Sequence, residues 1–260
     1  MNENVRETHP LIYCITNDVV MNFTANGLLA VGAAPVMSKQ PKEAADLAAA
    51  ANGLLLNMGT LTDVQFEAMR NAGVSANLNN VPIVFDPVAV GATTFRSQSA
   101  VQLLEQIEMT VVRGNSGEVA SLVGMEANVR GVDGSSAIDT STIAKKAAKE
   151  LNTIVCVTGE TDAVSDGEQT ITITSGHEWL TKVVGTGCLL GAIITAYVST
   201  DQENTLEAVA SALVDYGLCA EAAYTRSEQD GIGTFQQAFL DELSKRTSTT
   251  TLSKEHFVYV

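Results

Sequence analysis

Short apolar segments alternate with helical patterns over residues 11–158, and this alternation restricts the possible folds more than any other feature of the sequence. Each segment is rich in Leu, Ile or Val and has the length of a buried strand. The segments are residues 11–15, 54–59, 82–86, 110–115 and 153–159. Helical patterns over about 18–31 and 61–78 separate the first three, and another helix is expected before the last. Apolar strands joined by helices predict a mostly parallel sheet with helices on both faces.

The alternation ends at about residue 158, in a β-rich stretch that two turn signals interrupt. Gly159 and the pair Asp166-Gly167 are flanked by β-branched residues, which predicts consecutive antiparallel strands at one edge of the sheet. Beyond Gly187 the sequence is helical almost to its end. The candidate helices are about 188–199, 204–226 and 234–246.

The chain contains no segment rich in Pro, Gly or Ser that could separate two domains. Its 260 residues are 45% hydrophobic, which is ample for one large core, so we expect a single α/β domain over residues 1–260. Residues 1–8 and 247–260 are expected to be tails, and the end of the second one is ambiguous between a tail and an added strand.

The charge of the chain limits its partners. A formal net charge of −15 repels phosphate backbones and anionic lipids, so neither nucleic acid nor a membrane is an expected partner. The first residues lack the apolar run of a signal peptide, and the longest apolar stretch, Cys188–Val198, is too short to span a bilayer. We therefore expect a cytoplasmic protein. The four cysteines and three histidines show no disulfide or zinc spacing.

Residues Val184–Cys188, VGTGC, run directly into the apolar segment LLGAIITAYV and give the sharpest functional signal. Glycines let the backbone approach a ligand closely, and the N–H groups of a helix's first turn bind anions. A thiol at such a helix N-terminus is expected to ionise more readily than a free Cys, whose pKa is about 8.5, so Cys188 is a candidate base or nucleophile. The alternative is a Gly-rich helix start with a buried, inert Cys.

Two carboxylates follow expected strands. Asp86 ends PIVFD, and Glu118 lies three residues after Asn115 in RGNSGE, near the start of the next helix. Two oxygen donors in one cleft suit Mg²⁺, which keeps several waters and shares its other positions with phosphate oxygens. The alternatives are a turn-forming Asp before a Pro and, for Glu118, an acid in a capping box.

Other loops after expected strands hold polar side chains, and ligands bind at that edge of an α/β sheet. These loops are residues 57–60, 86–88, 113–115 and 158–160. Arg113 is a candidate phosphate partner or one half of an ordinary ion pair. Thr158 could offer its hydroxyl to a phosphate or simply cap a turn, and Met37 could line an apolar ligand pocket or the core.

Six strings occur in a collinear order that resembles the hydroxyethylthiazole kinase family of the ribokinase-like superfamily. They are ITNDVVMNFTANGLLAVGAAPVM, LNMGTL, DPVAVGATTFR, RGNSGE, VTGETDAVSDG and VGTGCLLGA. The resemblance covers about residues 9–243 and is far more specific than any one string. It implies one ribokinase-like domain without a separate lid, and a homotrimer whose active sites lie between subunits. The implied reaction is ATP- and Mg²⁺-dependent phosphorylation of the hydroxyl of 4-methyl-5-(2-hydroxyethyl)thiazole, in thiamine salvage.

The resemblance also implies a role for particular residues. Cys188 would be the catalytic base, in a position where other members of the superfamily usually have Asp. Asp86 and Glu118 would arrange Mg²⁺. The positions implied for ATP are Arg113, Thr158 and Gly187, and those implied for the thiazole are Asn17, Met37, Gly59 and Gly185.

The sequence departs from the family pattern at three positions. Tyr13 stands where the family usually has His, Ala89 replaces a common Gly, and Ile232 replaces a common Pro. The first two are expected near the cleft, where they could alter the fit of the substrate. Two other functions stay open from the sequence: a kinase of the same superfamily that acts on another small alcohol, such as a hydroxymethylpyrimidine, and a metabolite sensor without turnover.

Overall fold

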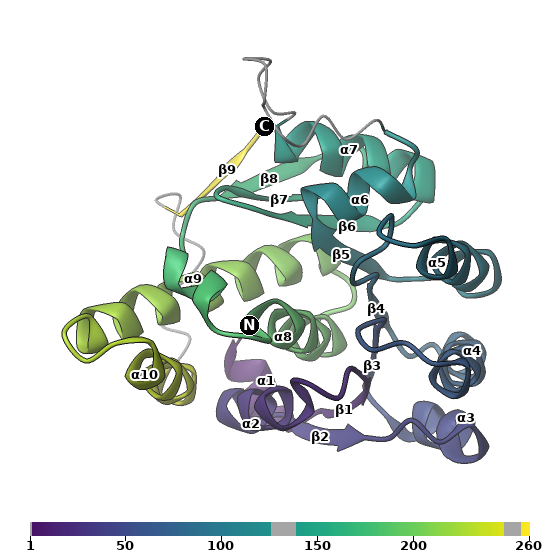
Figure 1. The fold of residues 1–260 in the computed structure, drawn as a ribbon, viewed down its shortest axis with the longest axis horizontal. Coiled ribbons are helices and arrows are strands. Elements are labelled where there is room, and N and C mark those ends of the chain that lie inside the picture. The colour runs from purple at the N-terminus through teal and green to yellow at the C-terminus, as the bar shows by residue number, and fades with distance from the viewer. Residues whose placement is uncertain (1, 126–138, 247–255) are drawn as a thin grey trace.

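One nine-stranded sheet runs through the computed structural model, which describes residues 2–125, 139–246 and 256–260 (Figure 1). The strand order is β2-β1-β3-β4-β5-β6-β7-β8-β9. The strands are β1 (Leu11–Ile15), β2 (Ala34–Met37), β3 (Gly53–Asn57), β4 (Ile83–Asp86), β5 (Val111–Asn115), β6 (Ile154–Thr158), β7 (Asp162–Ser165), β8 (Thr170–Ile173) and β9 (Phe257–Tyr259). The pairs from β2 to β6 are parallel and those from β6 to β9 are antiparallel. The prediction of a mostly parallel sheet with an antiparallel edge is therefore confirmed.

Helices cover both faces of the sheet (Figure 1). The helices are α1 (Asn2–Thr8), α2 (Met21–Val31), α3 (Pro41–Ala50), α4 (Asp63–Leu78), α5 (Thr94–Gln106), α6 (Ser116–Leu122), α7 (Thr140–Leu151), α8 (Thr186–Thr200), α9 (Thr205–Ser227) and α10 (Ile232–Lys245), with a short 3₁₀ helix η1 (Glu178–Lys182). One apolar core lies under α3 to α7, and the other lies under α1, α2, α8, α9 and α10. Successive residues of a strand belong to opposite cores. In β1, Tyr13 and Ile15 belong to the core under α3 to α7, and Ile12 and Cys14 belong to the core on the other face.

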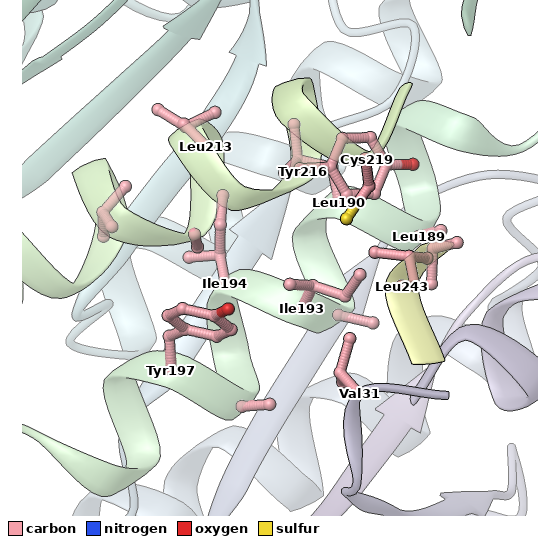
Figure 2. Packing of buried hydrophobic residues seen from close by; sticks show 14 of the residues in the cluster. Val31, Leu189, Leu190, Ile193, Ile194, Tyr197, Leu213, Tyr216, Cys219 and Leu243 are labelled. Carbon is pink, nitrogen blue, oxygen red and sulfur yellow. The ribbon is translucent and has the colours of Figure 1, made fainter. Parts of the chain in front are cut away.

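Helix α8 lies between the sheet and the outer helices α2 and α9. Every side chain from Leu189 to Val198 is buried, so the apolar stretch that is too short for a membrane is a core helix instead. Figure 2 shows its Leu, Ile and Tyr side chains packed among Val31 of α2, Leu213 and Cys219 of α9, and Leu243 of α10. This packing fixes the N-terminus of α8 beside the sheet. No helix among the described residues is long and apolar enough to cross a membrane.

The expected strands and helices are present, with ends that move by at most three residues. Helix α8 begins at Thr186, two residues before the expected start, because the VGTGC segment itself forms the first turn. The helices α3 and α5 were not singled out from the sequence. Both carry recognisable start signals, since Pro41 follows the N-cap Gln40, and the Thr93 side chain accepts the N–H of Arg96.

The two expected tails need correction where the structure describes them. Residues 2–8 form α1, in which Val5 is fully buried and the Arg6 guanidinium donates to the carbonyls of Ala30 and Leu243. At the other end, β9 pairs antiparallel with β8. Residues 247–255 of the second expected tail lie outside the described residues. Both ends are thus held by the domain, because α1 covers the ends of two helices and β9 covers a sheet edge.

Candidate active site

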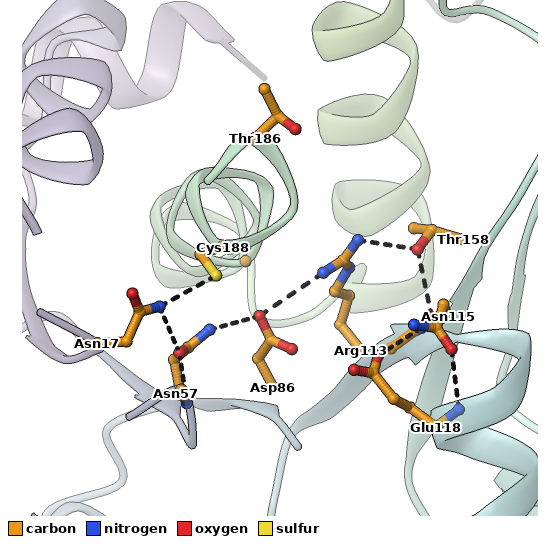
Figure 3. A network of polar contacts seen from close by, with 12 residues as sticks. Asn17, Asn57, Asp86, Arg113, Asn115, Glu118, Thr158, Thr186 and Cys188 are labelled. Atoms are coloured by element: carbon orange, nitrogen blue, oxygen red, sulfur yellow. Dashed lines mark hydrogen bonds and ion pairs between the residues drawn. The ribbon is translucent and has the colours of Figure 1, made fainter. Parts of the chain in front are cut away.

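A line of polar side chains crosses the carboxyl ends of five neighbouring strands (Figure 3). We call it the polar row; it consists of Cys188, Asn17, Asn57, Asp86, Arg113 and Thr158. Parallel strands end at the same edge of the sheet, so residues that are far apart in the sequence meet there. The register places Asn57 beside Asp86, and Arg113 belongs to the strand between those of Asp86 and Thr158.

Hydrogen bonds and one ion pair connect the polar row from end to end (Figure 3). The Asn17 amide donates from Nδ2 to Cys188 Sγ at 3.2 Å and to Asn57 Oδ1 at 3.1 Å. Asn57 Nδ2 donates to Asp86 Oδ2 at 2.7 Å. The guanidinium of Arg113 lies 3.6 Å from the same Asp86 oxygen and donates to Thr158 Oγ1 at 2.8 Å. Each member therefore restrains the position of the next.

The N-terminus of α8 lies against the polar row. Gly185, the N-cap, has a φ of +93°, and a Cβ there would come within 2.4 Å of Val20. The N–H groups of Thr186, Gly187 and Cys188 have no partner within the helix, so they are available to an anion. The hydroxyl of Tyr216 on α9 donates to Thr186 O at 2.6 Å and holds this first turn in place. An anion hole at this first turn stays a prediction.

Cys188 is partly buried in this first turn. Burial is the largest cause that raises the pKa of its thiol, and the nearby charge of Asp86 raises it further. The amides of Asn57 and Asn17 and the charge of Arg113 act in the opposite direction without cancelling these effects. The direction is the opposite of the one expected from a helix N-terminus, because burial and a neighbouring carboxylate both disfavour the thiolate.

Asp86 is buried at the end of β4. Burial raises the pKa of its carboxyl to about 7, and Glu118 adds to the rise, while Arg113 and the Asn57 amide oppose it. Its Oδ2 accepts from Asn57, but its Oδ1 is buried without a hydrogen-bond partner among the described residues. An unpartnered buried carboxylate oxygen calls for a ligand, and a cation between two carboxylates would also relieve their repulsion.

Glu118 forms the capping box that was its alternative role and also reaches the loop after β4. Its Oε2 accepts the N–H of Asn115, whose side chain accepts the N–H of Glu118 in return. Its Oε1 accepts the N–H of Ala89 at 2.8 Å. Each carboxylate oxygen of Glu118 accepts one N–H and keeps a further lone pair. The two hydrogen bonds therefore hold the carboxylate in place and leave it able to bind a cation.

Arg113, Thr158 and Gly187 lie together as expected. The Arg113 guanidinium lies so close to Gly187 that a Cβ on this residue would be 3.1 Å from the guanidinium nitrogen Nη1. The Nε of Arg113 is buried without a partner in the described chain. All three residues line a cavity of about 820 Å³ between β6, the loop before η1, and helices α8 and α9. This volume is in the range of pockets for small molecules and cofactors.

The four residues expected around the thiazole also lie at this edge of the sheet. Asn17 belongs to the polar row, and a Cβ on Gly59 would meet its side chain within 2.6 Å. Gly185 is the N-cap of α8. Met37 is the half-buried last residue of β2, beside β1, and packs partly against the core. They lie on the side of the polar row that is opposite the 820 Å³ cavity.

Tyr13 and Ile232, where the sequence departs from the family pattern, lie in different parts of the fold. Tyr13 is buried in the core under α3 to α7, and its hydroxyl donates to Ser38 O, next to Met37. Ile232 begins α10 and packs against the other core. Tyr13 thus contacts the loop after β2, next to Met37.

Asn57 is the residue of the site that was not identified from the sequence as a functional residue, although its loop was. It is fully buried and joins Asn17 to Asp86. A polar side chain at the end of an apolar strand was the available signal.

Three comparisons with known proteins identify the family. A model of the hydroxyethylthiazole kinase family matches residues 3–249. The hydroxyethylthiazole kinase of Shouchella clausii is 52% identical over 94% of both chains. The chain belongs to the hydroxyethylthiazole kinase family.

Solved structures agree with this assignment. The hydroxyethylthiazole kinase of Pyrococcus horikoshii superposes with a TM-score of 0.89 at 37% identity, covering 100% of this chain and 97% of the other. A ribokinase-like superfamily protein from Enterococcus faecalis has a TM-score of 0.68 at 11% identity, over 94% of this chain and 88% of its own, and shows the fold alone. As a hydroxyethylthiazole kinase family member, the chain is a phosphotransferase with a ribokinase-like fold, and the polar row is its candidate active site.

Ala89 provides a test of the loop that holds Glu118. It has a φ of +60°, a region that costs a non-glycine residue about 1–2 kcal/mol. Ala89→Gly removes this strain but also raises the conformational entropy of the unfolded chain, which offsets part of the gain. We therefore expect the free energy of unfolding to rise by up to about 1 kcal/mol. Ala92→Gly in the same exposed loop, at a residue with negative φ, should lose roughly 0.5–1 kcal/mol. Denaturant unfolding measures the free energy of unfolding of each variant. If Ala89→Gly loses as much stability as Ala92→Gly, the backbone at Ala89 is not strained.

Proposed function

We propose that the protein transfers the γ-phosphoryl group of ATP, with Mg²⁺, to the hydroxyl of 4-methyl-5-(2-hydroxyethyl)thiazole, in thiamine salvage in the cytoplasm. The observation that carries the proposal is the continuity of the polar row. It runs from Asn17 and Cys188, beside the residues expected around an alcohol, to Arg113 and Thr158 at the 820 Å³ cavity. Phosphoryl transfer depends mainly on such positioning and on stabilising charge.

The cavity is proposed to hold the nucleotide. Arg113 offers a guanidinium held by Asp86 and Thr158, and the first-turn N–H groups of α8 lie beside it. Cationic and N–H donors at fixed positions stabilise the charge of the transferring group without having to reorganise. Among the described residues, these groups bring positive potential to one place in a chain with a net charge of −15, which allows an anionic nucleotide to bind.

Cys188 is proposed as the base. The oxygen of the substrate hydroxyl forms a bond to the γ-phosphorus, the bond from that phosphorus to the leaving oxygen of ADP breaks, and the hydroxyl proton moves to Cys188 Sγ. The sulfur already accepts a hydrogen bond from Asn17, which orients it. Because burial raises the pKa of the thiol, only a minor fraction is thiolate at neutral pH.

The residues around Asp86 fit a magnesium ion. Asp86 Oδ1 is buried without a partner in the described chain, and the N–H groups of Ala89 and Asn115 fix the carboxylate of Glu118 on α6. No group of three or more His, Cys, Asp or Glu suited to a metal occurs among the described residues, which is consistent with Mg²⁺ bound through few protein ligands, waters and phosphate. When bound, the ion would neutralise charge on the phosphate oxygens.

A coupled assay of ADP formation tests the proposed function. The purified protein should consume ATP over many turnovers only when the thiazole alcohol and Mg²⁺ are both present. A hydroxymethylpyrimidine alcohol serves as the alternative acceptor. Faster turnover of the pyrimidine would reassign the substrate, and the absence of turnover with either alcohol would favour a sensor.

Replacing either proposed metal ligand should reduce turnover strongly. We expect Asp86→Ala and Glu118→Ala to lose at least about 10²-fold in kcat, with partial rescue of one variant at raised Mg²⁺, because few protein ligands share the ion. Glu105→Ala, which removes an exposed acid from α5, is the control and should match the wild type. The metal assignment is wrong if both variants keep wild-type rates at low Mg²⁺.

The proposed base has a signature in the pH profile. Cys188→Ala should lose about 10² to 10⁴ in kcat and keep its affinity for ATP. Wild-type activity should rise with pH into the alkaline range, since the raised pKa of the thiol delays formation of the thiolate. Cys188→Asp should be active with this limb moved to acid pH.

Controls for Cys188 use another buried thiol. Cys219→Ala removes a sulfur from α9, away from the polar row, and should keep the wild-type profile. An Ala variant of Cys188 with wild-type turnover, or an Asp variant with an unchanged pH profile, would show that Cys188 only lies beside the anion hole.

A homotrimer with active sites between subunits is also proposed. Val19 and Val184 are 64% and 68% exposed, and each lies within two residues of a proposed thiazole contact, Asn17 or Gly185. Leu29 on α2 is 59% exposed. Large exposed apolar side chains around a ligand site favour a covering subunit. Light scattering should give three times the 27.3 kDa of one chain, and a fully active monomer would contradict the shared site.

A further inference from the structure

Asn57 lies at the centre of the polar row without a role in the proposed chemistry. Its side chain is fully buried, and three hydrogen bonds hold it in place. Its Oδ1 accepts the N–H of Gly59 at 3.0 Å and the Asn17 Nδ2 at 3.1 Å, and its Nδ2 donates to Asp86 Oδ2 at 2.7 Å. The second hydrogen of Nδ2 is not part of this set, and the Asn57 amide also acts to lower the pKa of the Cys188 thiol.

The bond from Gly59 settles which way the Asn57 amide is turned. A backbone N–H can only donate, so the atom of Asn57 that faces it must be the oxygen. The same oxygen faces the Asn17 amide, so Asn17 must present its NH₂ group to Asn57. The polarity of two side chains at the site is therefore fixed by one main-chain group.

This arrangement uses both hydrogens of the Asn17 NH₂ group. One goes to Asn57 Oδ1 and the other to Cys188 Sγ. The Asn17 oxygen, Oδ1, has no hydrogen-bond partner in the part of the chain that the structure describes, and it points away from Asn57 (Figure 3). It belongs to the same amide whose nitrogen lies 3.2 Å from the sulfur, so it is close to the proposed base.

We propose that Asn57 is a positioning residue that fixes the Asn17 amide so that Asn17 offers a hydrogen-bond acceptor to the hydroxyl of the alcohol. This inference rests on the proposed function. In the bound state the hydroxyl donates its hydrogen bond to Asn17 Oδ1. The proton moves to Cys188 Sγ in those molecules whose thiol has already lost its own proton to solvent. Asn57 thus makes the site selective for a hydroxyl over an ether or alkyl group, since neither can donate.

Binding of two ligands separates this role from a purely structural one. Isothermal titration at pH 7, without nucleotide or Mg²⁺, gives the Kd of the thiazole alcohol and of 4-methyl-5-ethylthiazole, which lacks only the hydroxyl. A single net hydrogen bond is worth roughly 2- to 10-fold in affinity, so the wild type should prefer the alcohol by about that ratio. In Asn57→Leu, the Asn17 amide loses its hydrogen bond to Asn57 Oδ1. The ratio of the two Kd values should then fall to about 1. Removing the ligand hydroxyl and removing Asn57 together form a double-mutant cycle, which isolates this one interaction.

Two more variants serve as controls. Asn57→Asp keeps an oxygen for both Gly59 and Asn17, so it should keep the ratio even if turnover changes through Asp86. Gln65→Leu removes another buried amide, which contacts the carbonyls of Thr16, Asn57 and Gly59 and no side chain of the polar row. It should lower the Tm but keep the ratio. The Asp and Gln65 variants keep the test decisive if Asn57→Leu fails to fold.

The outcomes distinguish the inference from the proposed function. If the wild type phosphorylates the alcohol but binds both ligands equally, or if Asn57→Leu keeps the preference, the role of Asn57 is wrong. Loss of the preference in Asn57→Asp or Gln65→Leu would contradict it as well. If the wild type does not phosphorylate the alcohol at all, the proposed function fails, and the inference fails with it.

Discussion

The buried contact between Asp86 and Arg113 holds the two sides of the site together. Their charged groups lie 3.6 Å apart, with Asp86 1% and Arg113 9% exposed. Removal of one partner of a buried pair leaves an uncompensated charge, which typically costs about 3–5 kcal/mol. Asp86 also accepts from Asn57, and Arg113 also donates to Thr158, so the alcohol side and the cavity side are positioned by the same pair. Helix α8 completes the arrangement because its buried face fixes its N-terminus over this pair.

The sequence was sufficient for the parallel sheet, the antiparallel edge and the meeting of Asp86, Arg113, Thr158 and Cys188, because strand ends and glycines carry strong local signals. It was insufficient for α1 and β9. Those elements depend on distant partners: the carbonyls that Arg6 binds on α2 and α10, and the strand β8. A short terminal segment has no periodicity that reveals such partners.

Asn57 and the ionisation of Cys188 show a second limit. A single Asn at the end of an apolar strand has many possible uses. The register and the hydrogen bonds show that Asn57 joins two candidate site residues, Asn17 and Asp86. For Cys188 the helix N-terminus was visible in the sequence, but its burial and the nearness of Asp86 were not. Desolvation depends on everything that packs around a group, so the local sequence is a poor guide to the direction of a pKa shift. The raised pKa is compatible with a base that acts only after the alcohol and nucleotide are in place.

The central claim is that the polar row brings one alcohol and one nucleotide together at the N-terminus of α8. A crystal structure with the thiazole alcohol, Mg²⁺ and a non-hydrolysable ATP analogue tests it most directly. We expect the hydroxyl within hydrogen-bond distance of Asn17 Oδ1 and beside Cys188 Sγ. The terminal phosphate should lie on the N–H groups of Gly187 and Cys188 with Arg113 beside it, and the metal on Asp86 Oδ1. Density for the nucleotide outside the 820 Å³ cavity, or for the alcohol away from Cys188, would contradict the account.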